Sequence, residues 1–400
     1  MFPTIDVRHC TDAFAAGYQY GTTAAKQIQL SINAYTTLFA SSGLTWKNAC
    51  IRAQAFLPAM QKYAPSSVLE LNAIAQGSQQ DVLSILALNC RSELLSPNFL
   101  TQLAEPNECT SIAIGNAKGN DVRDTWLAQN WDWMGGQRDA LVLLRGRSTD
   151  GHENNGYENH GYKNQGYKKQ GQQNQNAVEF ITLTEAGMLA KIGINDRGFA
   201  VALNILRSNQ DATRPGIAVH WLLRQLLSCH SVDCAFAMVQ KLAVEVGFGG
   251  SSNILCADRS GAVAALELSP NGVARIDPQA TGVVCHTNHF LDQHLLRDQA
   301  PYGQSTSTIA RLARIQSLSN ALNEHGQGDL FNLNRLEAML RDEDAGYLSI
   351  CRHPDPSIDA AARIESVAGV IMNVTTGTLW IAPDVPSKVP FEMVYSQAQS

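Results

Sequence analysis

The chain has 400 residues, of which 44% are hydrophobic and 16% are charged, and its formal net charge is −6. This composition is typical of a folded globular protein, and the acidic balance argues against a surface built for nucleic acid or another polyanion. No stretch approaches about 18 consecutive apolar residues, so no transmembrane helix is predicted.

The first hundred residues have the pattern of helices. In "DAFAAGYQYGTTAAKQIQLSINAYTTLF" and "SVLELNAIAQGSQQDVLSILALNCRSELL" the apolar residues recur at intervals of three and four. The pattern changes at "ECTSIAIG", which begins at residue 108, and short β-type runs separated by turn signals follow. A helical segment over 1–108 and a sheet-rich region over 109–400 are therefore expected.

Four β-hairpins are predicted in the second region, each with a Gly-containing turn between two apolar runs. The turns are Gly119-Asn120, 195–198, 258–261 and 375–377. Helices are predicted between them over 217–230, 231–245, about 305–323 and 332–342. Antiparallel hairpins combined with grouped helices favour an α+β layered fold over alternating βαβ units.

Residues 147–177 differ from the rest of the chain. Glycine recurs every five residues, and almost no aliphatic side chain is present to offset the ordering entropy. We expect a disordered Gly/Tyr/Asn/Gln-rich insertion at the tip of a hairpin, whose strands are "ALVLLRGR" and "VEFITLTEAG".

The nine cysteines are odd in number, scattered and without C-x-x-C pairs. Because no signal peptide is recognisable at the start of the chain, reduced thiols and a cytoplasmic location are expected. Most of these thiols should be small buried hydrophobic groups. The nine are Cys10, Cys50, Cys90, Cys109, Cys229, Cys234, Cys256, Cys285 and Cys351.

Cys109 lies where the pattern changes from helix to strand. From the residues alone it is a buried thiol, a disulfide partner, a metal ligand or a nucleophile. A cut before Cys109 would give it an α-amino group with a pKa of about 8, which is within reach of the thiol and suited to act as its base. The thiol itself would make that cut by attacking the carbonyl of Glu108, with hydrolysis of the resulting thioester.

An ordered set of motifs resembles a known family. Cys109-Thr110-Ser111, "AQNWDW" at 128–133, "SSNILCADRSG" at 251–261 and "HTNHF" at 286–290 are similar to the acyl-CoA:6-aminopenicillanic acid acyltransferase family (peptidase family C45). More distantly they resemble the bile-salt and penicillin V acylases, which are cysteine-type N-terminal-nucleophile (Ntn) hydrolases. The resemblance implies a four-layer αββα fold and self-cleavage between Glu108 and Cys109 into two subunits.

The resemblance also implies roles for four residues. Cys109 matches the nucleophile, and Asp132 matches the acidic residue that contacts the amino group of the nucleophile. Asn253 matches the asparagine of the oxyanion hole, which acts with a backbone N–H. Arg311 matches the active-site arginine of the family.

Other positions depart from the family pattern or have no role in it. Gln129 stands where the bile-salt branch has an arginine, so the substrate contacts of that branch are not transferred. Glu108 stands where glycine is common, which affects the rate of cleavage more than the event. Asn288 and His289 match a characteristic motif to which no role is assigned.

Structural alternatives exist for several of these residues. Asp132 could equally be a hairpin residue that caps a turn. Asn253 could be a simple turn residue that precedes a strand. Cys285, His286 and His289 suggest zinc, but no second Cys/His cluster accompanies them at a recognisable spacing.

The expected function is an autoproteolytic amidohydrolase or acyltransferase that needs no metal or organic cofactor. Its expected partners are a small acyl amide or acyl thioester, such as an acyl-CoA, and its own 1–108 fragment, with no nucleic acid and no membrane. The alternative is a non-catalytic or regulatory relative that stays a single chain. The acyl donor and acceptor are left open.

Overall fold

The computed structural model describes residues 1–95, 109–117, 124–148, 177–301, 306–324, 331–358 and 363–399. Glu108, on the other side of the expected cleavage site, and nearly all of the 147–177 insertion lie outside these ranges. Within the described ranges, no helix combines the length and the apolar character needed to cross a bilayer.

The N-terminal segment is helical, as predicted. Asp12 starts the first helix by accepting a hydrogen bond from the backbone N–H of Ala15 at 2.8 Å, and Asp81 caps a later helix in the same way through Leu83. The helices are α1 (Ala13–Thr23), α2 (Ala25–Ser41), α3 (Trp46–Ala53), α4 (Leu57–Tyr63), α5 (Pro65–Ser78), α6 (Val82–Asn89) and α7 (Arg91–Leu94).

Eight strands form the first sheet, in the spatial order β1-β4-β5-β6-β7-β8-β9-β10. All neighbours are antiparallel except β1 and β4, which run parallel. The strands are β1 (Thr4–Asp6), β4 (Leu141–Ser148), β5 (Val178–Glu185), β6 (Ile192–Asn195), β7 (Phe199–Ile205), β8 (Ser252–Asp258), β9 (Val263–Ser269) and β10 (Gly272–Ile276).

Six strands form the second sheet, in the order β11-β2-β3-β12-β13-β14, and all neighbours are antiparallel. They are β2 (Cys109–Ile114), β3 (Trp126–Met134), β11 (Val283–His286), β12 (Ile364–Asn373), β13 (Thr378–Ala382) and β14 (Glu392–Ser396). Strands β2 and β3 contact β7 and β8, so the two sheets pack face to face.

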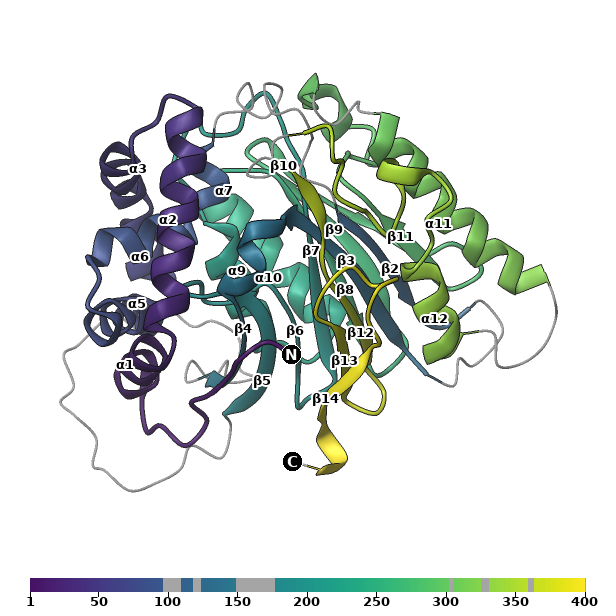
Figure 1. The fold of residues 1–400 in the computed structure, drawn as a ribbon, viewed down its shortest axis with the longest axis horizontal. Coiled ribbons are helices and arrows are strands. Elements are labelled where there is room, and N and C mark those ends of the chain that lie inside the picture. The colour runs from purple at the N-terminus through teal and green to yellow at the C-terminus, as the bar shows by residue number, and fades with distance from the viewer. Residues whose placement is uncertain are drawn as a thin grey trace.

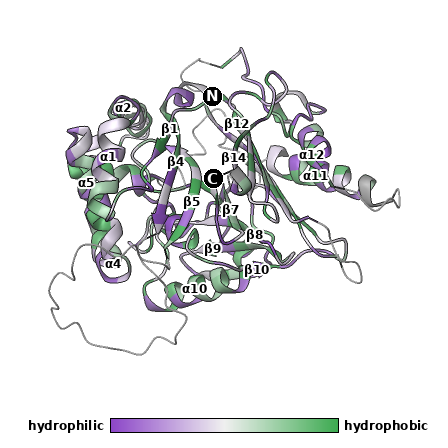
Figure 2. Ribbon diagram, turned by 90° about the horizontal axis from the view of Figure 1, so that it is seen from below, coloured by the Kyte–Doolittle hydropathy of each residue, from purple (hydrophilic) through white to green (hydrophobic). Residues whose placement is uncertain are grey.

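Helices cover both outer faces of the paired sheets (Figure 1). The N-terminal helices, with α9 (Val219–Leu226) and α10 (Val232–Glu245), lie on the side of the eight-stranded sheet. The helices α11 (Thr306–Glu324) and α12 (Leu333–Leu340) cover the six-stranded sheet. Figure 2 shows the same separation from a second direction, with the strands between the two groups of helices. The predicted four-layer αββα arrangement and its helix positions are confirmed.

The predicted hairpins are present, and their turns show why. Gly198, Gly261 and Gly377 have φ values of +73°, +93° and +65°, a left-handed conformation that glycine adopts without steric cost. The tip of the hairpin between β2 and β3 lies outside the described residues. The flanks of the insertion are β4 and β5, which pair antiparallel as predicted.

Strand β1 was not predicted, because only three residues form it and its partner is more than 130 residues away in the chain. It pairs with the edge of β4 through the register Thr4 to Leu143. The N-terminal segment therefore contributes a strand to the larger sheet as well as helices.

Candidate active site

Cys109 opens β2 and lies opposite Trp131 of β3, with 6% of its surface exposed. Its backbone N–H donates to Asn288 Oδ1 at 2.8 Å. Its carbonyl oxygen accepts from Arg311 Nη1 at 2.7 Å and from Asn204 Nδ2 at 3.2 Å. Side chains from three distant parts of the chain thus fix both backbone polar groups of this one residue.

Arg311 extends from α11 and is buried, with 1% exposure. Beyond Cys109 it contacts Thr110 Oγ1 at 2.8 Å through Nη1 and Asn288 Oδ1 at 3.1 Å through Nη2. Ser307, one turn earlier on the helix, accepts from Nε at 3.3 Å. Asn288 therefore bridges the guanidinium group and the nitrogen of Cys109.

Asn253 lies on β8 directly across from Asn204 on β7. Its Nδ2 donates to Asn204 Oδ1 at 3.0 Å, and Ser111 Oγ donates to the same oxygen at 2.7 Å. Asn253 is thus linked to the carbonyl of Cys109 by way of hydrogen bonds through Asn204. Its own Oδ1 is buried and has no hydrogen-bond partner in the part of the chain that the structure describes.

Asp132 follows Trp131 on β3 and is 1% exposed. Its Oδ1 accepts from Ser366 Oγ of β12 at 2.6 Å. The hydrogen bond on the Cys109 nitrogen goes to Asn288, as described above. Asp132 affects the thiol electrostatically, because its negative charge raises the pKa of Cys109 while a hydrogen bond from its backbone lowers it.

Lys191 is a buried cation near the thiol that sequence reasoning missed. Its Nζ lies 3.4 Å from the centre of the Trp131 ring and 3.8 Å from Glu185 Oε2. Burial raises the pKa of the Cys109 thiol to about 11, and the charge of Lys191 is the main influence that lowers it. Burial in turn lowers the pKa of Lys191 to about 7.

Glu185 connects Lys191 to the N-terminal helices. It accepts a hydrogen bond from Arg91 Nη2 of α7 at 2.8 Å and another from the Tyr35 hydroxyl of α2. The guanidinium of Arg91 also lies over the rings of Tyr35 and Trp133, at 5.0 Å and 5.1 Å. Residues of the 1–95 segment therefore hold the carboxylate that accompanies the buried lysine.

The missed residues carry only weak signals in the sequence. Lys191 interrupts the apolar run "AGMLAKIGI", and a lone charge in such a run is the one sign of a buried functional group. Asn204, in "VALNIL", gives no sign beyond being polar within a strand.

Gln129 forms hydrogen bonds between the two sheets. Its Nε2 donates to the Leu203 carbonyl at 2.5 Å, and its Oε1 accepts from the Leu203 N–H at 3.2 Å. Both polar groups of the amide are thereby used between β3 and β7.

Ordinary partners occupy the histidines of the alternative zinc site. His286 Nε2 lies 2.8 Å from Glu267 Oε1, and His289 Nδ1 lies 3.0 Å from Thr308 Oγ1. Cys285 is buried in an apolar cluster between the second sheet and its outer helices. Among the described residues, the one group of three potential metal ligands lies elsewhere and includes none of these three.

The chain is similar to several proteins of known sequence or structure. Solved structures with limited similarity include a mutant of the conjugated bile acid hydrolase from Clostridium perfringens (12% identity, 72% of this chain, 96% of that chain, TM-score 0.43). Another is a penicillin V acylase from Agrobacterium tumefaciens (13% identity, 68% of this chain, 82% of that chain, TM-score 0.43). A curated relative, the acyl-coenzyme A:6-aminopenicillanic-acid-acyltransferase 40 kDa form of Emericella nidulans, is 26% identical over 343 residues, which are 84% of this chain and 81% of the relative.

The family model described as acyl-coenzyme A:6-aminopenicillanic acid acyl-transferase matches residues 117–360. The chain belongs to this family, which confirms the resemblance inferred from the motifs.

Proposed function

We propose that this protein is a self-processing cysteine acyltransferase or amidohydrolase that forms an acyl-enzyme on Cys109. The observation that carries the proposal is the environment of Cys109. A thiol at the start of a strand has its own backbone nitrogen and carbonyl fixed by Asn288, Arg311 and Asn204. A structural cysteine needs no such arrangement, whereas a nucleophile whose nitrogen becomes the catalytic base does.

The first reaction is cleavage of the bond between Glu108 and Cys109. The thiol attacks the Glu108 carbonyl, the C–N bond breaks, and the Cys109 nitrogen takes up a proton to become an amine. Water then hydrolyses the thioester, which releases the Glu108 carboxylate and regenerates the thiol. Asn288 supports this step, because it already accepts a hydrogen bond from the nitrogen that becomes the leaving group.

The second reaction is acyl transfer. The new amine, with a pKa of about 8, takes the thiol proton, and the sulfur attacks the carbonyl of an amide or thioester. Asn253 and a backbone N–H stabilise the oxyanion, while Asn288 and Arg311 hold the nitrogen and the carbonyl of Cys109 in place. Asp132 acts on the thiol through its charge. The C–N or C–S bond of the donor then breaks, and its amine or thiol leaves with the proton held by the Cys109 amine. Water or an acceptor amine attacks the thioester, takes the acyl group and regenerates the thiol.

The substrate class follows from this chemistry and from the family. A thiol ester intermediate accepts acyl groups from amides and from thioesters, and the name of the Emericella nidulans relative includes an acyl-coenzyme A. Acyl-CoA donors with small amine acceptors are therefore the first substrates to screen, followed by acyl amides with water as acceptor.

The deciding experiment is intact-mass analysis with reducing electrophoresis of the wild-type protein, Cys109→Ala and a control, Cys285→Ala. Cys285 is another buried thiol, on the neighbouring strand β11. We expect two fragments in the wild type and in Cys285→Ala, with Cys109 at the N-terminus of the larger one, and a single chain in Cys109→Ala. A single uncut wild-type chain that forms no acyl-enzyme with an acyl-CoA would favour a non-catalytic relative instead.

A further inference from the structure

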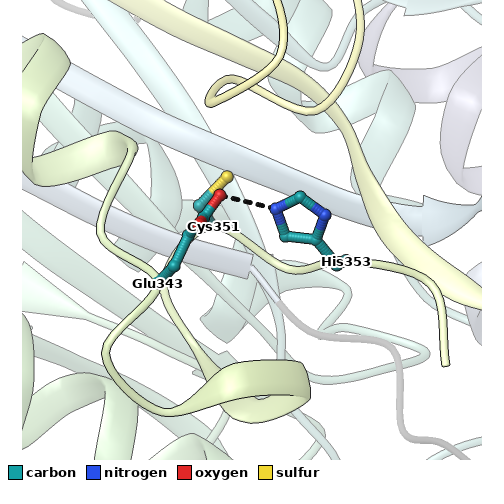
Figure 3. Close-up of side chains that lie close together, drawn as sticks. All are labelled: Glu343, Cys351 and His353. Atoms are coloured by element: carbon teal, nitrogen blue, oxygen red, sulfur yellow. Dashed lines mark hydrogen bonds and ion pairs between the residues drawn. The ribbon is translucent and has the colours of Figure 1, made fainter.

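Three side chains of different chemistry converge behind the second sheet, away from Cys109. They are Glu343 and the pair Cys351 and His353, which follow α12 in the chain. Figure 3 shows the His353 ring directed toward the carboxylate of Glu343, with the sulfur of Cys351 beside it. One ligand atom from each residue lies within 4.8 Å of the other two.

The cluster extends from the interior to the surface. Cys351 is buried, His353 is partly exposed and Glu343 is exposed. Glu343 and His353 also line a surface pocket of about 620 Å³. Glu343 and His353 can therefore be reached from solvent, and the sulfur of Cys351 lies beside them on the interior side (Figure 3).

The donor set is that of a borderline-soft divalent cation. A thiolate, an imidazole nitrogen and a carboxylate oxygen are all common zinc ligands, and three protein ligands with one open position make a four-coordinate site. When zinc is coordinated tetrahedrally with bonds of about 2.0–2.3 Å, its ligand atoms lie roughly 3.3–3.7 Å from one another. His353 Nε2 and Glu343 Oε1 are now 2.6 Å apart, so the ion would replace their hydrogen bond after a movement of less than about 1 Å.

Neighbouring charges favour and oppose such an ion. Arg363 and Lys388 line the same pocket and repel a cation. A carboxylate and a thiolate together supply two negative charges, which balance the two positive charges of a divalent ion at bonding distance. Ser387 Oγ, 3.0 Å from His353 Nε2, is placed to hydrogen-bond a ligand or a bound water.

The segment that carries Cys351 and His353 is bonded to the strand beside Asp132. The Arg352 N–H donates to Ser366 Oγ at 2.9 Å, and the Ser366 N–H donates to the Arg352 carbonyl at 3.0 Å. Ser366 Oγ in turn donates to Asp132 Oδ1 at 2.6 Å. Fixing residues 351 and 353 would therefore fix the hydroxyl group that holds Asp132.

We propose that Glu343, Cys351 and His353 bind one zinc-type divalent cation, which anchors the 351–353 segment behind Asp132. The ion takes no part in acyl transfer. On binding, the Cys351 thiol gives up its proton to solvent, and the ion displaces the hydrogen bond between Glu343 and His353.

The test is direct titration of the full-length protein, prepared without a polyhistidine tag and stripped with a chelator. Zn²⁺ is added in competition with a chromophoric chelator, and Co²⁺ is added separately to detect a thiolate-to-metal charge-transfer band. We expect one ion per chain and a Co²⁺ thiolate band. Cys351→Ser and His353→Gln should each weaken binding by more than about 100-fold, beyond what loss of an outer-shell partner costs. Glu343→Gln should weaken it less.

His9→Gln is the matched control, because His9 is exposed and precedes another cysteine, Cys10. The affinity of His9→Gln for Zn²⁺ should equal that of the wild type. His353→Gln alters a partly exposed side chain and should keep the wild-type circular dichroism spectrum, so a loss of binding there reports on the site. Absence of stoichiometric binding in the wild type, or unchanged binding in both Cys351→Ser and His353→Gln, would overturn the proposal.

Hydrogen exchange gives the second readout. The amides of Arg352 and Ser366 should exchange more slowly with Zn²⁺, and unchanged exchange would refute the anchoring role.

Discussion

The thiol of Cys109 lies among charged groups whose effects oppose one another. Burial and the carboxylate of Asp132 disfavour the thiolate, whereas Lys191 and the more weakly acting Arg311 favour it. Lys191 lies against the ring of Trp131, the residue paired with Cys109, so its charge acts through apolar surroundings where electrostatic interactions are strong.

Replacing Lys191 tests this balance. Because its pKa is about 7, Lys191 carries a positive charge only up to about neutral pH, and there it favours the thiolate. Lys191→Met should therefore slow the alkylation of Cys109 roughly 10-fold at about pH 6 and change it little above about pH 9, where Lys191 is neutral. The measurement is iodoacetamide labelling across pH, with the Cys109 peptide quantified by mass spectrometry because eight other cysteines are present.

Two further variants control this experiment. Lys191→Arg retains the positive charge and should be alkylated at close to the wild-type rate at about pH 6, and Lys241→Met removes a lysine from the surface of α10. A wild-type profile in Lys191→Met would show that this cation does not act on the thiol.

Asn288 is the second residue whose role is testable. Asn288→Leu would leave the Cys109 N–H buried without its acceptor, which costs about 1–3 kcal/mol. If Asn288 orients the scissile nitrogen, self-cleavage should slow by roughly 5- to 150-fold. The rate is measured by electrophoresis after synthesis in a cell-free system. Asn271→Leu, at an exposed turn, should cleave at the wild-type rate.

Residues differ in how far the sequence reveals their place in the site. Cys109 was found because it coincides with a change of pattern, and Arg311 because a resemblance supplied it. Asn204 and Lys191 were not found, since their importance depends on which strands face each other across the two sheets. That pairing is a property of the fold, and the local pattern does not contain it.

At the scale of elements, α1 and α5 cross at an unusually short distance. A Cβ atom on Gly21 would lie 2.3 Å from the carbonyl oxygen of Ile74, and one on Gly77 would lie 2.2 Å from that of Tyr18. Glycine at these positions allows the two helix backbones to touch. Helix α5 also contacts α2, the helix that carries Tyr35.

Gly21→Ala should therefore force the helices apart and lower the free energy of unfolding by about 1–3 kcal/mol. Denaturant unfolding in the uncleaved Cys109→Ala background measures this as a shift in the midpoint. Gly136→Ala is the control, because a Cβ there meets no atom within 4 Å, and it should change stability by less than about 0.5 kcal/mol. Equal midpoints for the two variants would contradict the packing argument.

The predictable elements were those with local signals. The turns at Gly198 and Gly261 have a glycine with positive φ three residues after Asn195 and Asp258. The helices α10 and α12 follow from apolar spacing. β1 had no such signal, because its three residues become a strand only when β4 is beside them.

At the scale of the whole molecule, the N-terminal segment is held by many buried contacts. Asn89 Nδ2 donates to the Gly187 carbonyl at 2.8 Å, and Arg91 pairs with Glu185 in the interior. None of the nine cysteines forms a disulfide, so no covalent bond would join the fragments after cleavage.

If the chain is cleaved before Cys109 as proposed, the two fragments should nevertheless stay together. We expect cleaved protein to elute from a size-exclusion column as one species containing both pieces, and the pieces to separate only in denaturant. Electrophoresis of each fraction identifies its contents. Elution of the larger fragment alone in native buffer would contradict this expectation and would remove Arg91 and Tyr35 from the site.

The parallel pairing of β1 with β4 has a consequence for solubility. The Leu143 N–H donates to the Pro3 carbonyl, and the Val7 N–H donates to the Arg145 carbonyl, so the first residues of the chain occupy the open side of β4. Without them, β4 becomes the exposed edge of the larger sheet, with backbone groups free to pair with other molecules. The N-terminal segment should thus shield the larger sheet from self-association, independently of any reaction at Cys109.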